Sequence, residues 1–177
     1  FVEWSGDAIG NANPFTVTMV SEKNITATFA LHTYSLTVNA TNGSVTKDPD
    51  QDSYNYGTDV KLTATANTGY HFVDWSGDLS GTQNPDTITM IDGNKTVTAN
   101  FAINTYTLSV SATNGSVTRN PNAEVYEHGT QVELTAVANT GYHFLDWSGD
   151  MSGTTNPDTI TMDGNKEVTA NFAINTY

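Results

Sequence analysis

The sequence GYHFVDWSGD, at Gly69–Asp78, returns 72 residues later as GYHFLDWSGD at Gly141–Asp150, and FVEWSGD stands at Phe1–Asp7. Outward from this stretch, the segments Tyr34–Asn104 and Tyr106–Asn175 align almost residue for residue. Self-similarity at a fixed period is the signature of a tandem array of one structural unit. The sequence therefore predicts two and a half copies of one module of about 72 residues.

The repeat also predicts how the chain divides into domains. Residues 1–32 form the second half of a module, residues 33–104 and 105–175 form full modules, and residues 176–177 begin another. Neither end of the chain supplies the first half of the leading module. We therefore expect these modules to belong to a longer array.

Each module reads as a series of short strands. Apolar and polar residues alternate over short runs, turns rich in Asn, Gly and Pro separate them, and no 3.6-residue period is long enough for a helix. The 30 Thr and 19 Asn residues agree, because Thr favours strands and Asn favours turns. We expect an all-β fold in which each module is a small six-stranded sandwich. In the first full module the expected strands are Tyr34–Ala40, Ser44–Thr46, Val60–Ala66, Tyr70–Trp75, Thr87–Met90 and Val97–Phe101.

A module of this size buries only a small core, so its aromatic residues must supply much of it. In a regular pleat Tyr70 and Phe72 share one face of the strand, whereas Trp75 lies on the other. A bulge at Val73-Asp74 would bring these rings to one side. The expected core residues of the three units are Trp4, Phe29, Tyr70, Phe72, Trp75, Phe101, Tyr142, Phe144, Trp147 and Phe172.

The segment that joins the two full modules has no features of a flexible linker. Phe101–Tyr106 contains neither Gly nor Pro, and its apolar residues change parity at Asn104-Thr105. The same change occurs between Leu31 and Tyr34. The sequence predicts a stiff, direct junction. We expect four residues to form these joints: Leu31, Ile103, Asn104 and Thr105.

Composition excludes several classes of function. The formal net charge is −13, so a nucleic-acid or anionic membrane surface is not expected, because phosphates would be repelled. The chain has no Cys, which excludes disulfides, thiolate metal sites and cysteine nucleophiles. No apolar run approaches the roughly 20 residues needed to cross a bilayer. We therefore expect no direct membrane insertion in this segment.

The loop that follows the aromatic strand is the best candidate for a metal site. Its carboxylates could bind Ca²⁺, which prefers oxygen ligands. The alternative is that Asp78 and Asp150 accept backbone N–H groups and fix the turn. We favour the turn, because the leading half-module has no Asp at the position of Asp86. We expect no other cofactor. The candidate calcium ligands are Asp74, Asp78, Asp86, Asp146, Asp150 and Asp158.

The residues show no catalytic constellation. His71 and His143 recur, but each lies on a strand without other metal ligands at a suitable spacing. The sequence has no activated Ser motif and no Gly-rich phosphate loop ahead of a helix. The Trp residues could stack on sugars, yet each ends an apolar strand, which favours a place in the core. We therefore expect no enzymatic activity.

Four motifs of the first full module, GYHFVDWSGD, NPDTITM, DGNK and VTANFA, resemble the divergent InlB B-repeat family of bacterial surface proteins. The resemblance implies an extracellular, tandemly repeated β module in a large envelope-attached or secreted protein. It also implies a β-grasp-like topology as the alternative to a plain sandwich.

Two functions follow from these observations as expectations. The linker-free joint favours a rigid spacer, stalk or fibre element at a cell surface, with neighbouring repeats as its partners and lateral association of copies as a further step. The alternative is an adhesive module that binds surface glycans or a protein partner through many weak sites. A shared exposed aromatic patch would favour binding, and a uniform polar surface would favour the spacer.

Overall fold

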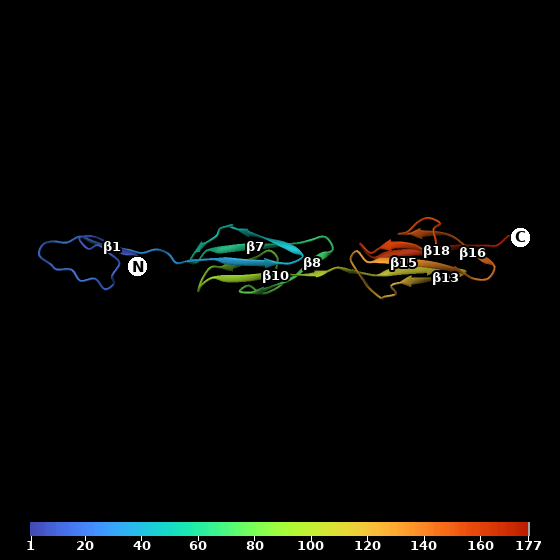
Figure 1. The fold of residues 1–177 in the computed structure, drawn as a ribbon, viewed down its shortest axis with the longest axis horizontal. Helices are drawn as coiled ribbons and strands as arrows, with labels where there is room; N and C mark the ends of the chain where they lie inside the picture. Colours follow the sequence, from blue (N-terminus) through green and yellow to red (C-terminus); the bar gives the residue numbers. More distant parts are fainter. Residues whose placement is uncertain (177) are drawn as a thin grey trace.

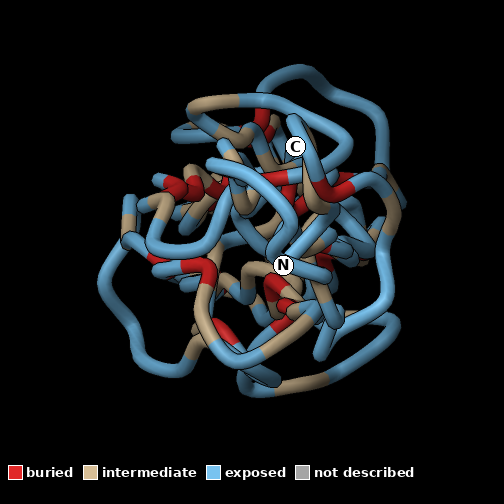
Figure 2. Tube along the Cα trace, turned by 90° about the vertical axis from the view of Figure 1, so that its left-hand side faces the viewer, coloured by how far each residue is buried: buried red, intermediate tan, exposed pale blue. Residues whose placement is uncertain are grey.

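A computed structural model describes residues 1–176, and these residues form an all-β fold, which confirms the predicted fold class. Figure 1 shows the chain drawn out along one axis, with a hairpin followed by two β modules in a row. Seen down that axis in Figure 2, buried residues lie toward the middle and exposed loops form the rim. No helix in the described residues is long and apolar enough to cross a membrane.

The strands of the two full modules correspond one to one. The leading half-module holds β1 (Glu3–Gly6) and β2 (Ile25–Thr28). The first full module holds β3 (Thr33–Tyr34), β4 (Leu36–Ala40), β5 (Gly43–Asp48), β6 (Tyr54–Asn55), β7 (Asp59–Ala66), β8 (Tyr70–Gly77), β9 (Asp86–Thr89) and β10 (Lys95–Ile103). The second holds β11 (Thr105–Tyr106), β12 (Leu108–Ala112), β13 (Gly115–Asn120), β14 (Tyr126–Glu127), β15 (Gln131–Ala138), β16 (Tyr142–Gly149), β17 (Asp158–Thr161) and β18 (Lys166–Ile174).

Each full module is a sandwich of two three-stranded sheets. In the first module one sheet has the order β4-β10-β8 and the other β5-β7-β9. The pairing of β10 with β4 is parallel, whereas β10 with β8 and both pairs of the second sheet are antiparallel. The ribbon β3-β6 lies outside these sheets. The second module repeats the arrangement as β12-β18-β16, β13-β15-β17 and β11-β14.

Both sheets contribute to one core per module. Trp75 is 2% exposed, and its indole Nε1–H donates to the carbonyl of Gln83 at 2.8 Å, which satisfies its polar atom. Phe72 and Phe101 pack against this core and are partly exposed. Trp147, Phe144 and Phe172 take the same places in the second module. The buried cluster of the first module is Leu36, Tyr54, Val60, Leu62, Ala64, Trp75, Ile88, Met90, Val97 and Ala99.

The bulge predicted in the aromatic strand is confirmed. Asp74 pairs with Asn100 and Phe72 pairs with Phe101, so Val73 is left without a partner in the ladder. The extra residue shifts the pleat by one position. As a result Phe72 and Trp75 meet, with ring centroids 5.1 Å apart.

Four residues expected in the core are less buried than the sequence suggested. Tyr70 and Tyr142 are half-buried and lie outside the buried clusters, because they begin their strands at the end of the module. Phe29 is 72% exposed and Trp4 is half-buried. In the full module Phe101 packs beneath Gly43 of the second sheet, and residues 1–32 contain no counterpart of that sheet's first strands.

Two buried tyrosines were missed by the sequence analysis. Tyr54 has no exposed surface, and its hydroxyl donates to the carbonyl of Pro49 at 3.0 Å and accepts the N–H of Gln51 at 3.2 Å. Tyr126 makes the equivalent contacts in the second module. Each lies in a two-residue strand, and pairs across a ribbon with the tyrosine near the start of its module, Tyr34 or Tyr106.

Candidate functional site

The joint between the two full modules is the candidate functional site, because the spacer hypothesis depends on it. β10 ends at Ile103 and β11 begins at Thr105, so a single residue, Asn104, separates the strands of successive modules. β11 belongs to the second module, since Thr105 pairs with Glu127 of β14. The chain therefore passes from one module to the next without a loop.

Asn104 is held from both sides. Its backbone N–H donates to the carbonyl of Gly69 in the first module, and its own carbonyl accepts the N–H of His128 in the second, both at 2.8 Å. Its side-chain Oδ1 lies 2.7 Å from Nδ1 of His71. Three hydrogen bonds thus fix the one residue that could act as a hinge.

The ring of His128 covers the turn that carries Gly69. A Cβ built on Gly69 would lie 2.3 Å from Cδ2 of His128, so any side chain there would have to displace the ring. Gly69 also has a φ of +82°, in the left-handed region that favours glycine. The His128 ring packs edge-on to Tyr106, with centroids 6.0 Å apart. Its Nδ1 is buried without a hydrogen-bond partner among the described residues, so packing holds this side of the ring.

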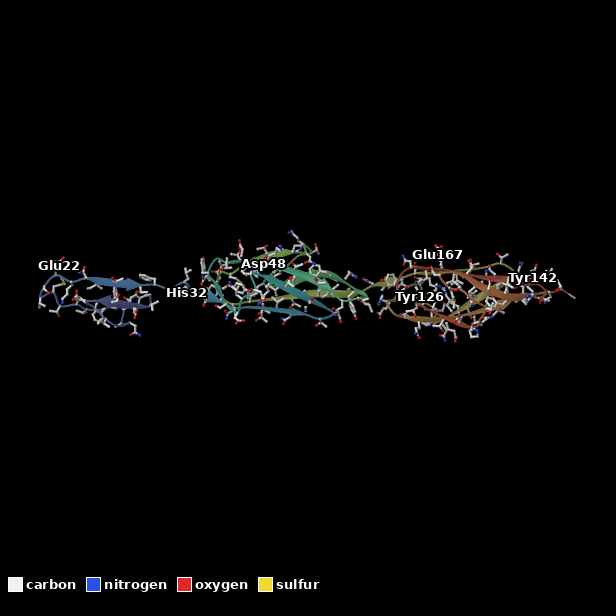
Figure 3. The ribbon with its side chains drawn as sticks, turned by 90° about the horizontal axis from the view of Figure 1, so that it is seen from above. Glu22, His32, Asp48, Tyr126, Tyr142 and Glu167 are labelled. Carbon is white, nitrogen blue, oxygen red and sulfur yellow. The ribbon has the colours of Figure 1, made fainter. Side chains whose placement is uncertain are left out.

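Residues at equivalent positions of the two full modules show what the joint buries. Ile103 is half-buried at the joint, whereas Ile174 at the far end of the second module is 64% exposed. Gly69 is buried, whereas Gly141 is half-buried and a Cβ built there would meet nothing within 4 Å. Tyr142, beside Gly141, marks this far end in Figure 3. Contact between the modules therefore buries surface that is otherwise open.

The joint between residues 1–32 and the first full module has the same backbone hydrogen bond, but no ring covers a turn there. The N–H of Tyr56, at the position of His128, donates to the carbonyl of His32 at 2.8 Å. His32 lies between the hairpin and the first module in Figure 3. Residues 1–32 contain no counterpart of the Gly69 turn. Leu31, which we expected to form part of this joint, is accordingly 66% exposed, and Tyr56 is 53% exposed.

The aspartate that ends the DWSGD or EWSGD loop fixes a turn in all three units. Oδ2 of Asp78 accepts the N–H of Thr96 at 2.7 Å, and Asp150 accepts the N–H of Glu167 at the same distance. Asp7 accepts the N–H of Asn24 at 2.8 Å. That hydrogen bond, together with the Lys23 ammonium, holds the pKa of Asp7 below its ordinary value. This is the geometry that the turn-fixing interpretation expects.

The other candidate calcium ligands have separate partners. Asp74 accepts a hydrogen bond from Nδ2 of Asn100 at 2.6 Å, and Asp146 accepts one from Asn171 at 2.7 Å. Asp86 and Asp158 each accept the N–H of the residue that follows. In the part of the chain that the structure describes, no three His or carboxylate side chains are grouped to hold a metal ion.

The candidate sugar platforms are not at the surface of the full modules. Trp75 and Trp147 are each 2% exposed, which leaves no ring face for stacking. The large apolar side chain exposed at equivalent positions of both modules is that of the bulged residue, Val73 in one and Leu145 in the other. Both are aliphatic, so the two full modules do not share an exposed aromatic patch among the described residues.

Together the fold and the joint define a class of protein, an array of directly fused β-sandwich repeats. The chain belongs to the divergent InlB B-repeat family, whose profile matches residues 1–33, 34–105 and 106–176. This confirms the resemblance seen in the sequence motifs. Domains of this family generally occur in extracellular or surface proteins. No curated protein is a significant match to the chain.

Proposed function

We propose that the chain is a non-catalytic region of a bacterial extracellular or cell-surface protein, and that its modules form a rigid spacer. The observation that carries this proposal is the Asn104 joint, where three hydrogen bonds and the His128 ring replace a linker. A spacer of this kind adds length with each module and adds no hinge. Its partners in this role are the neighbouring repeats of the same chain.

The polar surface of the modules also supports a spacer over an adhesive module. Two positions that differ between the modules, Lys61 against Glu133 and Thr96 against Glu167, are exposed and polar. A binding surface used in every module would keep the same chemistry at such positions. A flexible string of beads, which suits multivalent adhesion, is the alternative that the test below distinguishes.

Small-angle scattering on the chain and on arrays with additional copies of residues 34–105 tests the joint. We expect the maximum dimension to rise linearly with copy number. Insertion of Gly-Gly-Ser between Asn104 and Thr105 should bend that relation toward the square-root growth of a flexible chain. The matched control places the same insertion before Asp92, where the first module already carries one residue more than the second, Ile91.

Linear growth of the maximum dimension supports a rigid spacer, and square-root growth supports modules that move independently. The control insertion should leave the linear relation unchanged, because it lengthens a surface turn and not the joint. If the unmodified arrays already follow square-root growth, the rigid spacer is wrong. Independent beads on a string, which suit multivalent adhesion, would then be the better description.

A further inference from the structure

The first and last long strands of each module are parallel neighbours. Leu36 of β4 pairs with Lys95 of β10, and the register continues to Ala40 and Ala99. β12 and β18 repeat this pairing in the second module. The chain reaches β4 at one end of the module and leaves β10 at the opposite end, as Figure 1 shows.

This topology determines how tension on the chain reaches the module. A pull from the preceding module passes through β3, which pairs with β6, to the start of β4, and a pull from the following module acts on the end of β10. The two parallel strands are then drawn past each other along their length. All the hydrogen bonds of the ladder bear the force together, whereas strands pulled apart sideways break their bonds one at a time.

We propose that each module is a shear clamp, so that the array carries tension between a surface and whatever its far end holds. This function goes beyond spacing, because a stiff rod does not need strong modules. The clamp is a property of the module, and stiffness is a property of the joint.

The position of β10 strengthens the clamp. It is the middle strand of its sheet, bonded to β4 on one edge and to β8 on the other from Val97 to Ile103. The side chains of Val97 and Ala99 are buried in the core between the sheets. β10 therefore cannot slide without breaking two ladders and exposing apolar surface to water.

The DGNK turn anchors the residue at which tension enters the clamp. The N–H of Ser35, directly before β4, donates to Oδ1 of Asn94 at 2.9 Å, and the carbonyl of Ser35 accepts the N–H of Lys95 at 2.9 Å. In the second module Thr107 makes the equivalent bonds to Asn165 and Lys166. The N–H of that residue is thus tied to the turn before the last strand, and its carbonyl to the first residue of that strand.

Single-molecule pulling in two directions tests the clamp. The chain has no Cys, so introduced cysteines are unique attachment points. One experiment pulls the chain through its two ends, and unfolding of a full module is recognised by a gain in length of roughly 250 Å less the length of the folded module. The other pulls Thr37→Cys against Thr96→Cys, two exposed residues directly opposite each other in β4 and β10.

We expect the rupture force through the ends to be at least about twofold higher than the force across the pair, because only the first geometry loads the whole ladder at once. The same double-cysteine protein, capped and pulled through its ends, should rupture like the parent. That control shows that the substitutions have not weakened the module. Equal forces in the two directions would overturn the clamp.

A second variant examines the anchor separately. Asn94→Ala removes the acceptor of the Ser35 N–H, and should lower the end-to-end rupture force of the first module while the second module serves as an internal reference. The force across the Thr37 and Thr96 positions should stay the same. If neither module weakens, the anchor is not part of the clamp and the proposal fails at that point. Scattering measures the joint independently, so failure of the clamp leaves the spacer proposal standing.

Discussion

The imidazole ring of His128 lies directly over the backbone of Gly69, so the second module covers a turn of the first. A Cβ on Gly69 would overlap that ring, with Cδ2 only 2.3 Å away. The equivalent Gly141 has the same left-handed backbone, with a φ of +88°, and open space around it. The chain therefore contains two copies of one turn that differ in whether a neighbouring module covers them.

This pair of glycines offers a matched test of the joint. Both Gly69→Ala and Gly141→Ala carry the cost of a left-handed alanine, roughly 1–2 kcal/mol. Gly69→Ala should cost about 1–3 kcal/mol more, because the new methyl group must displace His128. Calorimetry measures the difference in unfolding free energy, and scattering should show a bend for Gly69→Ala alone. Equal effects of the two substitutions would mean that His128 does not hold the joint.

Replacement of the buried tryptophan tests the core. Trp75→Ala should destabilise the first module by about 3–5 kcal/mol, through lost burial and the cavity left behind. Trp147→Ala should do the same to the second module, since both rings are 2% exposed. Trp4→Ala is the control, because that ring is only half-buried. Thermal unfolding checks all three, and an unchanged melting temperature for Trp75→Ala would contradict the buried position.

The turn-fixing role of Asp78 and the calcium hypothesis predict different effects of a chelator on the melting temperature. Asp78→Ala removes the acceptor of the Thr96 N–H and should cost about 1 kcal/mol, discounted for its exposed position. If the carboxylate fixes the turn without a metal, a chelator should leave the melting temperature unchanged. A drop with chelator that added Ca²⁺ restores would show that the loop binds calcium.

An exposed ion pair predicts a small pH dependence in the second module. The Lys166 ammonium, 2.6 Å from Asp163, holds the pKa of the Asp163 carboxyl below its ordinary value. The pair therefore adds stability above the carboxyl's ordinary pKa, and this is lost as the pH falls through the lowered value. NMR titration of the Asp163 carboxyl should show the shift, and Lys166→Ala should return it to the ordinary value. An identical titration curve in the variant would contradict the pairing.

Local pattern was enough to predict the repeat, six of the strands in each module and the bulge at Val73. These follow from alternation and from turn residues, which lie close together in the sequence. Tyr54 could not be predicted as buried, because Tyr56 stands two positions later in the same polar loop and is 53% exposed, so the local pattern does not tell the two apart. The burial of Tyr54 depends on pairing with Tyr34 across the β3-β6 ribbon. Short ribbons of this kind leave too few residues for a pattern.

The joint was predicted only in outline. The parity change at Asn104-Thr105 indicated a direct connection, but nothing near it in sequence pointed to His128. The pairing of β11 with β14 is what brings that ring to Gly69. The first module has Tyr56, not His, at the same position. Leu31 was expected to form part of a joint, and its exposure accompanies the absence of a counterpart of the Gly69 turn in residues 1–32.

The single residue between modules also sets an angle. In the rigid array proposed above, where Asn104 is bonded to Gly69 on one side and to His128 on the other, each module would be rotated about the long axis by the same amount relative to the one before. In an array of identical joints, any chosen surface residue then recurs along a screw, at one pitch and one rise. Gain or loss of a repeat by recombination would then change both the length of the array and the direction that its far end faces, each in whole steps.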